Sequence, residues 1–406
     1  MKVRSITAFA PATASVEDAA AQAGAFLARA RKQVTDTGVE VQTVRLALAP
    51  LGDMVRAEAR PRQLVELATR LEAACTEMGI DYVSLGPWRQ GDPDHFATTI
   101  PEILGQTSRL FSTLAYASRD SGVDVHAAQL AAEVIVAAAP LEENGFANLR
   151  FAALANVDAG VPFLPSAWSA GDGWSFAIAL ECADLARGAF ADTTDLNSGA
   201  DDLVRRIEQA GAPLVEASRD LATNAFRFGG LDFSLAPFPR DEDSIGSTLE
   251  SMGVEACGLP GTAAASAILT SALGRAELPL TGFSGLFLPV LEDDRLARRA
   301  AEGDLRLEDL LLSSAVCGTG LDTVPLPGDT HAEDLLPWLL DLGALAVRLD
   351  KPLTARLMPM PGLEAGDPLE FDFPFFAAGA VMDLPRTRWA GSGSELPIRP
   401  RSRPLR

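Results

Sequence analysis

Short apolar runs alternate with longer amphipathic stretches through the first half of the chain, and this alternation limits the fold more than any other feature. Residues 3–9, 39–48 and 80–85 have the length and apolar character of strands. Helix signals lie between them: Ser15 is a candidate N-cap, and Pro61 stands at the start of a second helix. Strands that alternate with helices are typical of βαβ units, so we expect an α/β fold with a largely parallel sheet.

Polar side chains gather at the ends of the predicted strands, which continue through the second half at residues 151–157, 176–180, 231–235, 285–290 and 353–358. In parallel α/β folds the carboxyl ends of strands carry binding and catalytic groups, so we expect these side chains to share one polar cavity. Taken singly, each could instead cap a helix or satisfy a loop backbone. The set is Thr43, Arg45, Ser84, Asn156, Asp158, Glu181, Cys182, Ser234, Glu292, Asp293, Asp322 and Arg356.

The composition excludes several classes of protein. With 406 residues, 48% of them hydrophobic, the chain can bury a large core. Its formal net charge of -21 is opposite to what a nucleic-acid-binding surface needs. No run approaches the roughly 18 apolar residues of a membrane helix, and the N-terminal MKVRSITAFAPATA is too polar for a signal peptide. We therefore expect a cytoplasmic protein with neither nucleic-acid nor membrane partners.

Familiar catalytic and metal-binding motifs are absent from the sequence. The four cysteines form no CxxC pair and no metal-ligand spacing, so we expect reduced thiols and no structural zinc. There is no GxGxxG after the first strand, no GxxxxGK[ST], no GxSxG and no HExxH. Acid–base chemistry would therefore fall to carboxylates, Cys317 or Lys351.

The stretch SSAVCGTGLDTVPLPGDT, residues 313–330, has the composition of a binding-site wall. Its glycines permit turns that other residues resist, and its prolines fix φ and remove backbone donors, so we expect little long regular structure. Cys317, Asp322 and Asp329 lie among them. Loops on rigid scaffolds often carry function, although an ordinary loop–strand–loop would have the same composition.

Candidate roles follow from side-chain chemistry. Glu181, Asp322 and Asp329 could act as acid–base groups, and Cys317 as a nucleophile or proton donor if its pKa is lowered. No metal site is assigned and the cofactor stays unknown, although Asp322 and Asp329 could hold a divalent cation. The candidate substrate-binding residues are Arg45, Arg150 and Arg356, whose planar guanidinium groups suit an anion, together with Asn156, Ser234 and Thr262.

Several long stretches together resemble one protein family. They are VRSIT, VQTVRLA, ANLRFAALANVDAGVPFLPSAW, FAIALECADLA, FSLAPFPRDEDSIGSTLESMG, GLPGT, SGLFLPVLED, SAVCGTGLDTVPLPGDT and KPLTARLMPMPG. Over residues 1–385 the chain is similar to the DUF711 or UPF0210 family of uncharacterised proteins. The resemblance implies a single large ten-stranded α/β barrel similar to that of glycyl radical enzymes such as pyruvate formate-lyase, and a homodimer.

The C-terminal end of the chain differs in composition from the rest. We expect the barrel domain to span residues 1–388 and residues 389–406 to form a flexible tail, because this end is rich in Gly, Ser, Pro and Arg. Glycyl radical chemistry is not expected. The C-terminal WAGSGSELPIRPRSRPLR lacks the RVxGY-like segment that carries the radical, and the chain has no adjacent pair of cysteines.

Three functions compete at this point. The first is a cytoplasmic enzyme that acts on a small polar or anionic metabolite by non-radical acid–base or nucleophilic chemistry, with the reaction unknown. The second is a non-catalytic metabolite-binding or regulatory protein on an enzyme-like barrel, which only a turnover measurement separates from the first. The third, a structural interaction protein, would leave the polar clusters without an explanation.

Overall fold

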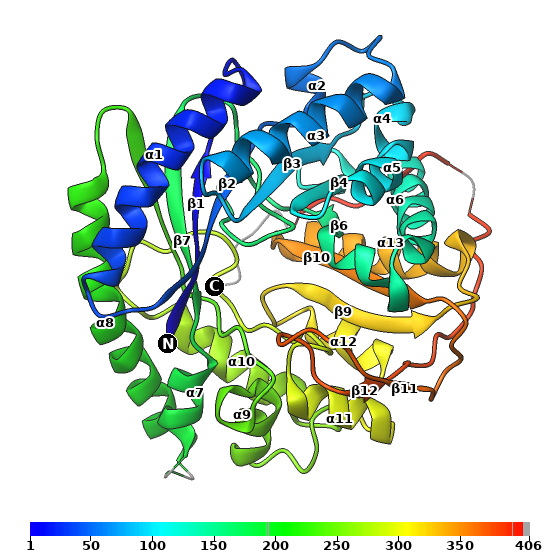
Figure 1. Cartoon of the computed structure of the whole chain (residues 1–406). Coiled ribbons are helices and arrows are strands. Elements are labelled where there is room, and N and C mark those ends of the chain that lie inside the picture. The colour runs from blue at the N-terminus through cyan, green and yellow to red at the C-terminus, as the bar shows by residue number, and fades with distance from the viewer. Residues whose placement is uncertain (192, 194, 392, 401–406) are drawn as a thin grey trace.

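A large mixed sheet forms the centre of the structure, a computed structural model that describes residues 1–191, 193, 195–391 and 393–400 (Figure 1). Its main strands are β1 (Lys2–Phe9), β2 (Val41–Ala47), β3 (Tyr82–Trp88), β4 (Leu110–Ser118), β6 (Phe151–Ala155), β7 (Trp174–Glu181), β8 (Phe226–Asp232), β9 (Gly320–Pro327) and β10 (Leu353–Met360). They form a continuous path in the order β8-β7-β1-β2-β3-β4-β6-β10-β9. Two short strands, β5 (Gly122–Asp124) and β13 (Glu395–Leu396), extend the sheet beside β4.

The path contains parallel strands that run in two opposite directions. β1, β2, β3, β4 and β6 are parallel to one another, and so are β7 with β8 and β9 with β10. The two groups meet at the antiparallel pairs β1–β7 and β6–β10. The carboxyl ends of the two groups therefore lie at opposite rims of the sheet, which the expected largely parallel sheet would not give.

The sheet is open between its two end strands. A strand is predicted at residues 285–290, but within the described part of the chain this segment forms isolated bridges only. Leu286 bridges to Leu235, just after β8, and Pro289 bridges to Asp322 in β9, both in the parallel sense. The architecture is thus a mixed α/β fold in which continuous strand pairing does not close into a barrel.

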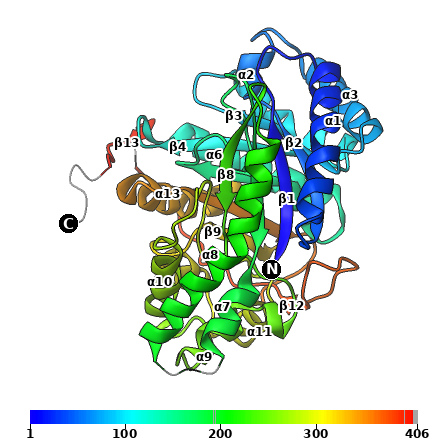
Figure 2. The same ribbon diagram turned by 90° about the vertical axis from the view of Figure 1, so that its left-hand side faces the viewer.

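Helices cover the outer face of the sheet (Figure 1). α1 packs on β1 and β2, and α8 lies along β8 (Figure 2). None of the described helices is long and apolar enough to cross a membrane. The α-helices are α1 (Val16–Thr35), α2 (Leu51–Met54), α3 (Pro61–Glu77), α4 (Asp94–Thr98), α5 (Ile100–Gln106), α6 (Val125–Ala138), α7 (Ala183–Phe190), α8 (Leu196–Leu221), α9 (Ile245–Ser251), α10 (Thr262–Leu273), α11 (Asp294–Glu302), α12 (Leu307–Ser313) and α13 (Ala332–Leu349). Short 3-10 helices cover Ala139–Leu141, Glu143–Arg150 and Asp241–Asp243, and β11 (Pro368–Leu369) pairs with β12 (Gly379–Ala380).

The connection between β6 and β7, residues 156–173, covers the inner face of the sheet in place of a helix. The carbonyl oxygen of Pro162 accepts hydrogen bonds from Ser5 Oγ at 3.1 Å and from Thr7 Oγ1 at 2.8 Å, both on β1. Ile6, which lies between them, belongs instead to the apolar core beneath the helices. This alternation follows from the two-residue period of a strand and leaves polar side chains facing inward.

Two strands were not expected from the sequence. β4 lies between two predicted strands, residues 80–85 and 151–157, where no strand is predicted. β9 lies inside the stretch 313–330, where little regular structure is predicted. Pro325 and Pro327 fit on β9 because it is the last strand of the continuous path, and proline is tolerated on such strands.

The C-terminal segment also departs from the expected tail. β13 pairs antiparallel with β5, so part of this segment has regular structure. Ahead of it, Arg386 and Arg388 form ion pairs with Asp329 and Glu333 of the same chain. Residues 392 and 401–406 of the predicted tail lie outside the described residues.

Candidate active site

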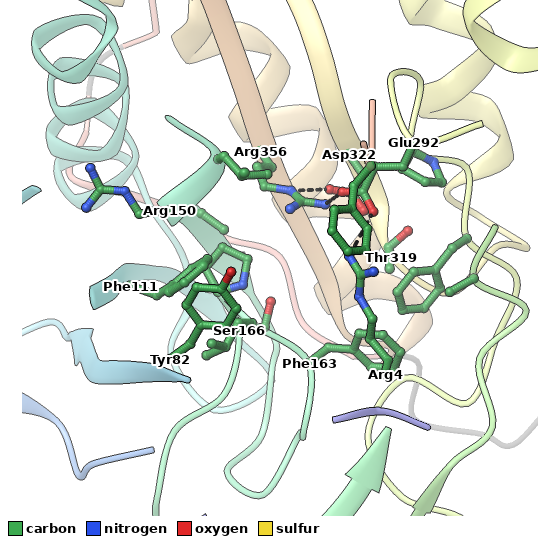
Figure 3. A pocket seen from close by; sticks show the side chains of 18 of the residues that line it. Arg4, Tyr82, Phe111, Arg150, Phe163, Ser166, Glu292, Thr319, Asp322 and Arg356 are labelled. Carbon is green, nitrogen blue, oxygen red and sulfur yellow. Dashed lines mark hydrogen bonds and ion pairs between the residues drawn. The ribbon is translucent and has the colours of Figure 1, made fainter. Parts of the chain in front are cut away.

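The inner side of the sheet holds a cavity of about 220 Å³ (Figure 3). Side chains from β1, β2, β3, β4, β6, β7, β9 and β10, from the β6–β7 connection and from other loops form its wall. The predicted site residues that line it are Arg45, Arg150, Glu181, Asp322 and Arg356. These residues come from four strands and from the 3-10 helix before β6, so the fold brings together groups that are far apart in the sequence.

Buried and half-buried carboxylates and arginines form one continuous chain of ion pairs along the cavity (Figure 3). Arg356 donates from Nε to Asp322 Oδ1 at 2.6 Å and from Nη2 to Glu292 Oε1 at 2.7 Å. Arg4 Nη2 lies 3.7 Å from Glu292 Oε2, and Arg4 Nη1 donates to Glu181 Oε2 at 3.2 Å. Burial lowers the pKa of Arg356, but Asp322 and Glu292 raise it by more, so that it lies above its ordinary value.

Among the carboxylates of this chain of ion pairs, Glu181 has the weakest contact with a positively charged group. Its Oε2 accepts from Arg4 and, at 3.2 Å, from the neutral amide Nε2 of Gln42. Burial raises the pKa of Glu181 above its ordinary value, although Arg4 and Gln42 oppose part of this rise. A carboxyl group with a raised pKa is suited to hold and release a proton.

A bulge in β1 turns Arg4 toward the cavity. The pairing of β1 with β7 shifts register between Val3 and Ser5, so Arg4 is the extra residue on its strand. Val3 belongs to the outer apolar core, whereas Arg4 and the next residue, Ser5, both face inward. Bulges re-aim side chains in this way, and strict alternation would have placed Arg4 on the outer face.

Arg45 is buried in the cavity wall, with 6% of its surface exposed. Its Nε donates to Thr43 Oγ1 at 2.9 Å, and its guanidinium carbon lies 5.8 Å from the centre of the Tyr82 ring. Within the described part of the chain it has no carboxylate in ion-pair distance. Burial, together with the like charge of Arg4, lowers the pKa of Arg45 to about 9, so the group still carries its charge at neutral pH.

Aromatic rings form a large apolar part of the remaining wall. Tyr82 and Phe111 meet edge to face with ring centres 5.5 Å apart, and Phe163 and Phe287 are 4.9 Å apart on another part of the wall. Phe375 covers the guanidinium of Arg4 at 4.6 Å. The other aromatic residues of the lining are Phe146, Phe283 and Phe373. The cavity therefore combines a few fixed charges with large apolar surfaces, as small-molecule sites commonly do.

Arg150 reaches the cavity wall, but its guanidinium group is bound by other groups of the protein. Its Nη1 donates to the Thr107 carbonyl at 2.9 Å, its Nη2 donates to the Leu104 carbonyl at 2.9 Å, and it pairs with Glu142. These carbonyls belong to the end of α5, where backbone acceptors have no partner within the helix. In Figure 3 its guanidinium lies apart from the other labelled charged groups. The structure therefore favours a helix-capping role over substrate binding.

Comparison with known proteins agrees with the sequence motifs. A family model described as "Uncharacterised ACR (DUF711)" matches residues 1–375. The chain belongs to the DUF711 family. A UPF0210 protein of Pyrobaculum arsenaticum is 32% identical over 361 residues, which cover 83% of this chain and 78% of the relative. UPF0210 proteins of Pyrobaculum islandicum (33% over 372 residues, 86% and 80% covered) and Syntrophobacter fumaroxidans (34% over 358 residues, 82% and 77% covered) are similar.

Asn156, in the longest motif that led to DUF711, lies outside the cavity lining. Its Nδ2 donates to Asp350 Oδ1 at 3.1 Å, and its Oδ1 accepts from the backbone N–H of Arg119 at 2.8 Å. Asn156 follows β6, whereas Glu181 ends β7, which belongs to the group of opposite direction. The two strand ends therefore lie at opposite rims, which corrects the expectation that both face one cavity.

Ser234 and Thr262, two other predicted binding residues in DUF711 motifs, also lie outside the lining. Ser234 Oγ donates to Asp232 Oδ1 at 2.6 Å. Thr262 Oγ1 donates to the Leu259 carbonyl at 2.8 Å and accepts from the Gly258 N–H at 2.9 Å, which fixes the turn before α10. Both hydroxyls are thus engaged in local structure.

The sequence predicts that Cys317, Asp322 and Asp329 belong to one site, but the structure places them apart. Cys317 is buried before β9, where its carbonyl accepts from Lys351 Nζ, and it does not line the cavity. Asp329 is exposed beyond the other end of β9 and pairs with Arg386. A strand rises about 3.3 Å per residue, so Asp329 lies roughly 20 Å from Asp322 along the chain.

Cysteine and metal chemistry have little support in the cavity. All four cysteines are unpaired and buried, and none lines the cavity. Burial raises the pKa of Cys75 to about 12 and also raises the pKa of Cys182 and of Cys257. Over residues 1–191, 193, 195–391 and 393–400, no group of three or more His, Cys, Asp or Glu could hold a metal ion. Asp322 and Asp329 are too far apart to share one.

Several cavity residues were missed or not assigned from the sequence. Glu292 was noted at a strand end and Gln42 as a polar residue of a predicted strand, but neither was given a role, whereas Arg4 and Tyr82 were not singled out at all. Arg4 was hidden by the bulge, because the strand period would turn it outward. The segment FDFPFF at residues 371–376 carried a usable signal, since so many aromatic residues in a short irregular stretch are unusual outside a binding surface.

Proposed function

We propose that this cavity is the active site of an enzyme that acts on a small anionic metabolite by non-radical acid–base chemistry. Arg45 carries the proposal, because it is a buried guanidinium in the cavity wall with no carboxylate partner among the described residues. A buried charge without a partner costs free energy, and an anion that enters the cavity removes that cost. A carboxylate or phosphate oxygen suits the planar guanidinium.

Glu181 is the group that we assign to proton transfer. Asp322 and Glu292 each accept a short hydrogen bond from Arg356, whereas Glu181 shares the more distant Arg4 and a neutral amide. A carboxyl group with a raised pKa could take a proton from, or give one to, an atom beside the bound anionic group. The arginine–carboxylate chain would supply fixed charges that need no rearrangement during the reaction.

A non-catalytic metabolite-binding protein is the second candidate. The observation that favours it is the lining itself, which contains no histidine, cysteine or lysine in the described part of the chain. Proton transfer would then depend on carboxylates that are mostly engaged in ion pairs. Turnover separates the two candidates, because both predict the same anion binding.

A thermal-shift screen of small carboxylates and phosphorylated metabolites tests the proposal. We expect at least one anion to raise the melting temperature of the parent protein, since a ligand that binds only the folded state stabilises it. Arg45→Gln should abolish this shift. Arg227→Gln, which changes an exposed arginine on β8 with 64% of its side chain exposed, is the matched control and should preserve it.

Mass-spectrometric analysis of products then tests catalysis with each stabilising anion. Conversion by the parent protein that is lost in Glu181→Gln supports the enzyme. Binding without conversion supports the second candidate. An anion that stabilises Arg45→Gln as strongly as the parent protein contradicts the site itself.

We also propose that the sheet forms a ten-stranded barrel of the glycyl radical enzyme type without glycyl radical chemistry. The support is the continuous path of strands, the two opposed parallel directions, and the segment 285–290, which bridges toward both end strands. An experimental structure in which residues 285–290 lie away from β9 would contradict it.

Location and assembly remain proposals as well. The net charge of -21 disfavours nucleic acid as a partner, and the four unpaired cysteines favour a cytoplasmic protein. We propose a small-molecule ligand and no membrane partner. The family resemblance favours a homodimer. Size-exclusion chromatography with light scattering tests the assembly, and a mass equal to one chain at micromolar concentration would contradict it.

A further inference from the structure

We propose that the ligand of this cavity is a small amino-acid-like zwitterion with an apolar side group, its carboxylate bound by Arg45 and its ammonium group bound by Glu181. This inference rests on the proposed function and narrows its anionic metabolite to one chemical class. Three observations lead to it: the charge balance of the cavity, the positions of the two charged partners, and the aromatic wall.

The ion-pair chain of the cavity has an excess of negative charge. It contains the carboxylates of Glu181, Glu292 and Asp322 but only the guanidinium groups of Arg4 and Arg356. Three negative charges and two positive charges leave one carboxylate in excess. Arg45 supplies one positive charge in excess elsewhere on the wall. A ligand that carries one charge of each sign would balance both, which a simple anion would not do.

Glu181 is the member of the chain that is free to accept a cation. Asp322 accepts at 2.6 Å and Glu292 at 2.7 Å from Arg356, and Glu292 also faces Arg4. Glu181 accepts at 3.2 Å from Arg4 through Oε2 only, and the same oxygen accepts from Gln42. Its Oε1 has no hydrogen-bond donor among the residues that the structure describes, so it remains available to an ammonium group.

The two charged partners are close enough to serve one small molecule. Glu181 and Arg45 lie on β7 and β2, which flank β1 on its two sides. Thr43 links the two regions, because its hydroxyl donates to the Arg4 carbonyl at 2.7 Å and accepts from Arg45. Glu181 aligns with Lys2 of β1 and Arg45 aligns with Thr7, so the two residues are offset by about 16 Å along the strands as well as about 10 Å across them. The side chains span much of this offset, because Arg45 bonds Thr43 and Glu181 bonds Gln42, the residue next to Thr43 on β2. The charged ends therefore approach each other over adjacent residues of β2, where a ligand with a carboxylate beside an ammonium group could contact both.

The rest of the wall requires an apolar side group. Tyr82, Phe111, Phe163 and Phe287 offer ring surfaces against which an apolar side group would pack. The cavity volume of about 220 Å³ is below the roughly 300–1,000 Å³ of drug-sized sites. Thr319 Oγ1 is buried in the lining without a hydrogen-bond partner in the described structure, and it could bond the ligand's polar end.

Isothermal titration calorimetry with two matched sets of ligands tests the inference on the full chain. The first set is L-phenylalanine, 3-phenylpropanoate and 2-phenylethylamine, and the second is L-leucine and 4-methylpentanoate. At least one amino acid should bind at least about 30-fold more tightly than its des-amino partner, because that partner leaves the excess carboxylate without a cation. The amine alone should bind more weakly than the amino acid by a similar factor.

Variants identify which residue reads which charge. Glu181→Gln should reduce the preference for the amino acid over its des-amino partner to about twofold, because the variant loses the carboxylate that binds the ammonium group. Arg45→Gln should weaken both, and Arg227→Gln should change neither. Equal or tighter binding of a des-amino acid, or no binding of either amino acid, overturns the zwitterion. If that des-amino acid, or any other carboxylate, still depends on Arg45, the anion site survives. If ligand binding depends on neither Glu181 nor Arg45, the proposed function is overturned as well.

Discussion

Two buried arginines of the same cavity have opposite surroundings. Arg356 on β10 has Asp322 at 2.6 Å and Glu292 at 2.7 Å, and these partners hold its pKa above the ordinary value. Arg45 on β2 is equally buried but has only the hydroxyl of Thr43 and the ring of Tyr82 beside it, and burial together with the charge of Arg4 lowers its pKa to about 9. Ion pairs with Asp322 and Glu292 offset the free-energy cost of burying the charge of Arg356, whereas no carboxylate of the described residues pairs with Arg45. A buried charge without a partner, such as that of Arg45, indicates a ligand, because stability alone would favour its removal.

The largest expected effect on stability comes from replacing Arg356, the arginine that has carboxylate partners. Arg356→Met leaves Asp322 and Glu292 buried without their cation, which should cost about 3–5 kcal/mol of unfolding free energy. Urea denaturation at pH 7 measures this loss. Arg227→Met, on the exposed surface, is the matched control and should cost far less. A loss for Arg356→Met no larger than for the control would show that the ion-pair chain is not needed to hold the cavity.

A buried carboxylate without a cation extends the comparison to the opposite sign. Asp232 accepts from Ser234 Oγ and from the backbone N–H groups of Phe283 and Ser284, and no arginine or lysine pairs with it in the described part of the chain. Burial raises its pKa to about 6, against about 3.9 when unfolded. The folded protein then keeps a proton that the unfolded chain has released, so this contribution to stability is full below pH 4 and is lost as pH rises through 6.

The unfolding free energy of the parent protein, relative to Asp232→Asn, should therefore fall by about 2–3 kcal/mol between pH 4 and pH 7. Urea denaturation at several pH values measures the slope. Asn at this position loses one acceptor, which adds an offset that does not depend on pH. Asp294→Asn, at an exposed position, should show no such slope. Parallel stability curves for Asp232→Asn and the parent protein would contradict a raised pKa.

The smallest effect is expected at Asp329, which the sequence had placed in the site. Its carboxylate is exposed and pairs with Arg386 across the surface. Exposed ion pairs contribute little to stability, so Asp329→Ala should leave the melting temperature and anion binding unchanged. A loss of ligand binding in this variant, with the fold retained, would return the end of the 313–330 stretch to the active site.

Strand periodicity and end polarity were sufficient to find much of the cavity from the sequence. Arg45, Glu181, Asp322 and Arg356 were all identified because they follow or interrupt apolar runs. The same rule selected Asn156 wrongly, since nothing in the sequence reveals that β6 and β7 belong to groups of opposite direction. Strand direction depends on long-range pairing, which a single sequence does not specify.

Other features were beyond local sequence rules for equally physical reasons. Arg4 faces inward because of a bulge, and a bulge is set by pairing with β7 rather than by the residues around it. Asp293, chosen as a candidate cavity residue, instead accepts from the N–H groups of Ile245 and Leu296 and so caps two helices. A carboxylate at a strand end looks the same in the sequence whether it caps helices or faces a ligand.

The stability of Arg45→Met tests the central claim most directly, and it requires no knowledge of the ligand. If Arg45 is an unpaired charge kept for an anion, its replacement by an apolar side chain of similar length should stabilise the protein by about 1 kcal/mol or more, while anion-induced thermal shifts disappear. Urea denaturation of this variant beside Arg356→Met gives the comparison in one experiment. A loss of stability for Arg45→Met comparable to that for Arg356→Met would contradict the account, because it would mean that the fold already pairs this charge.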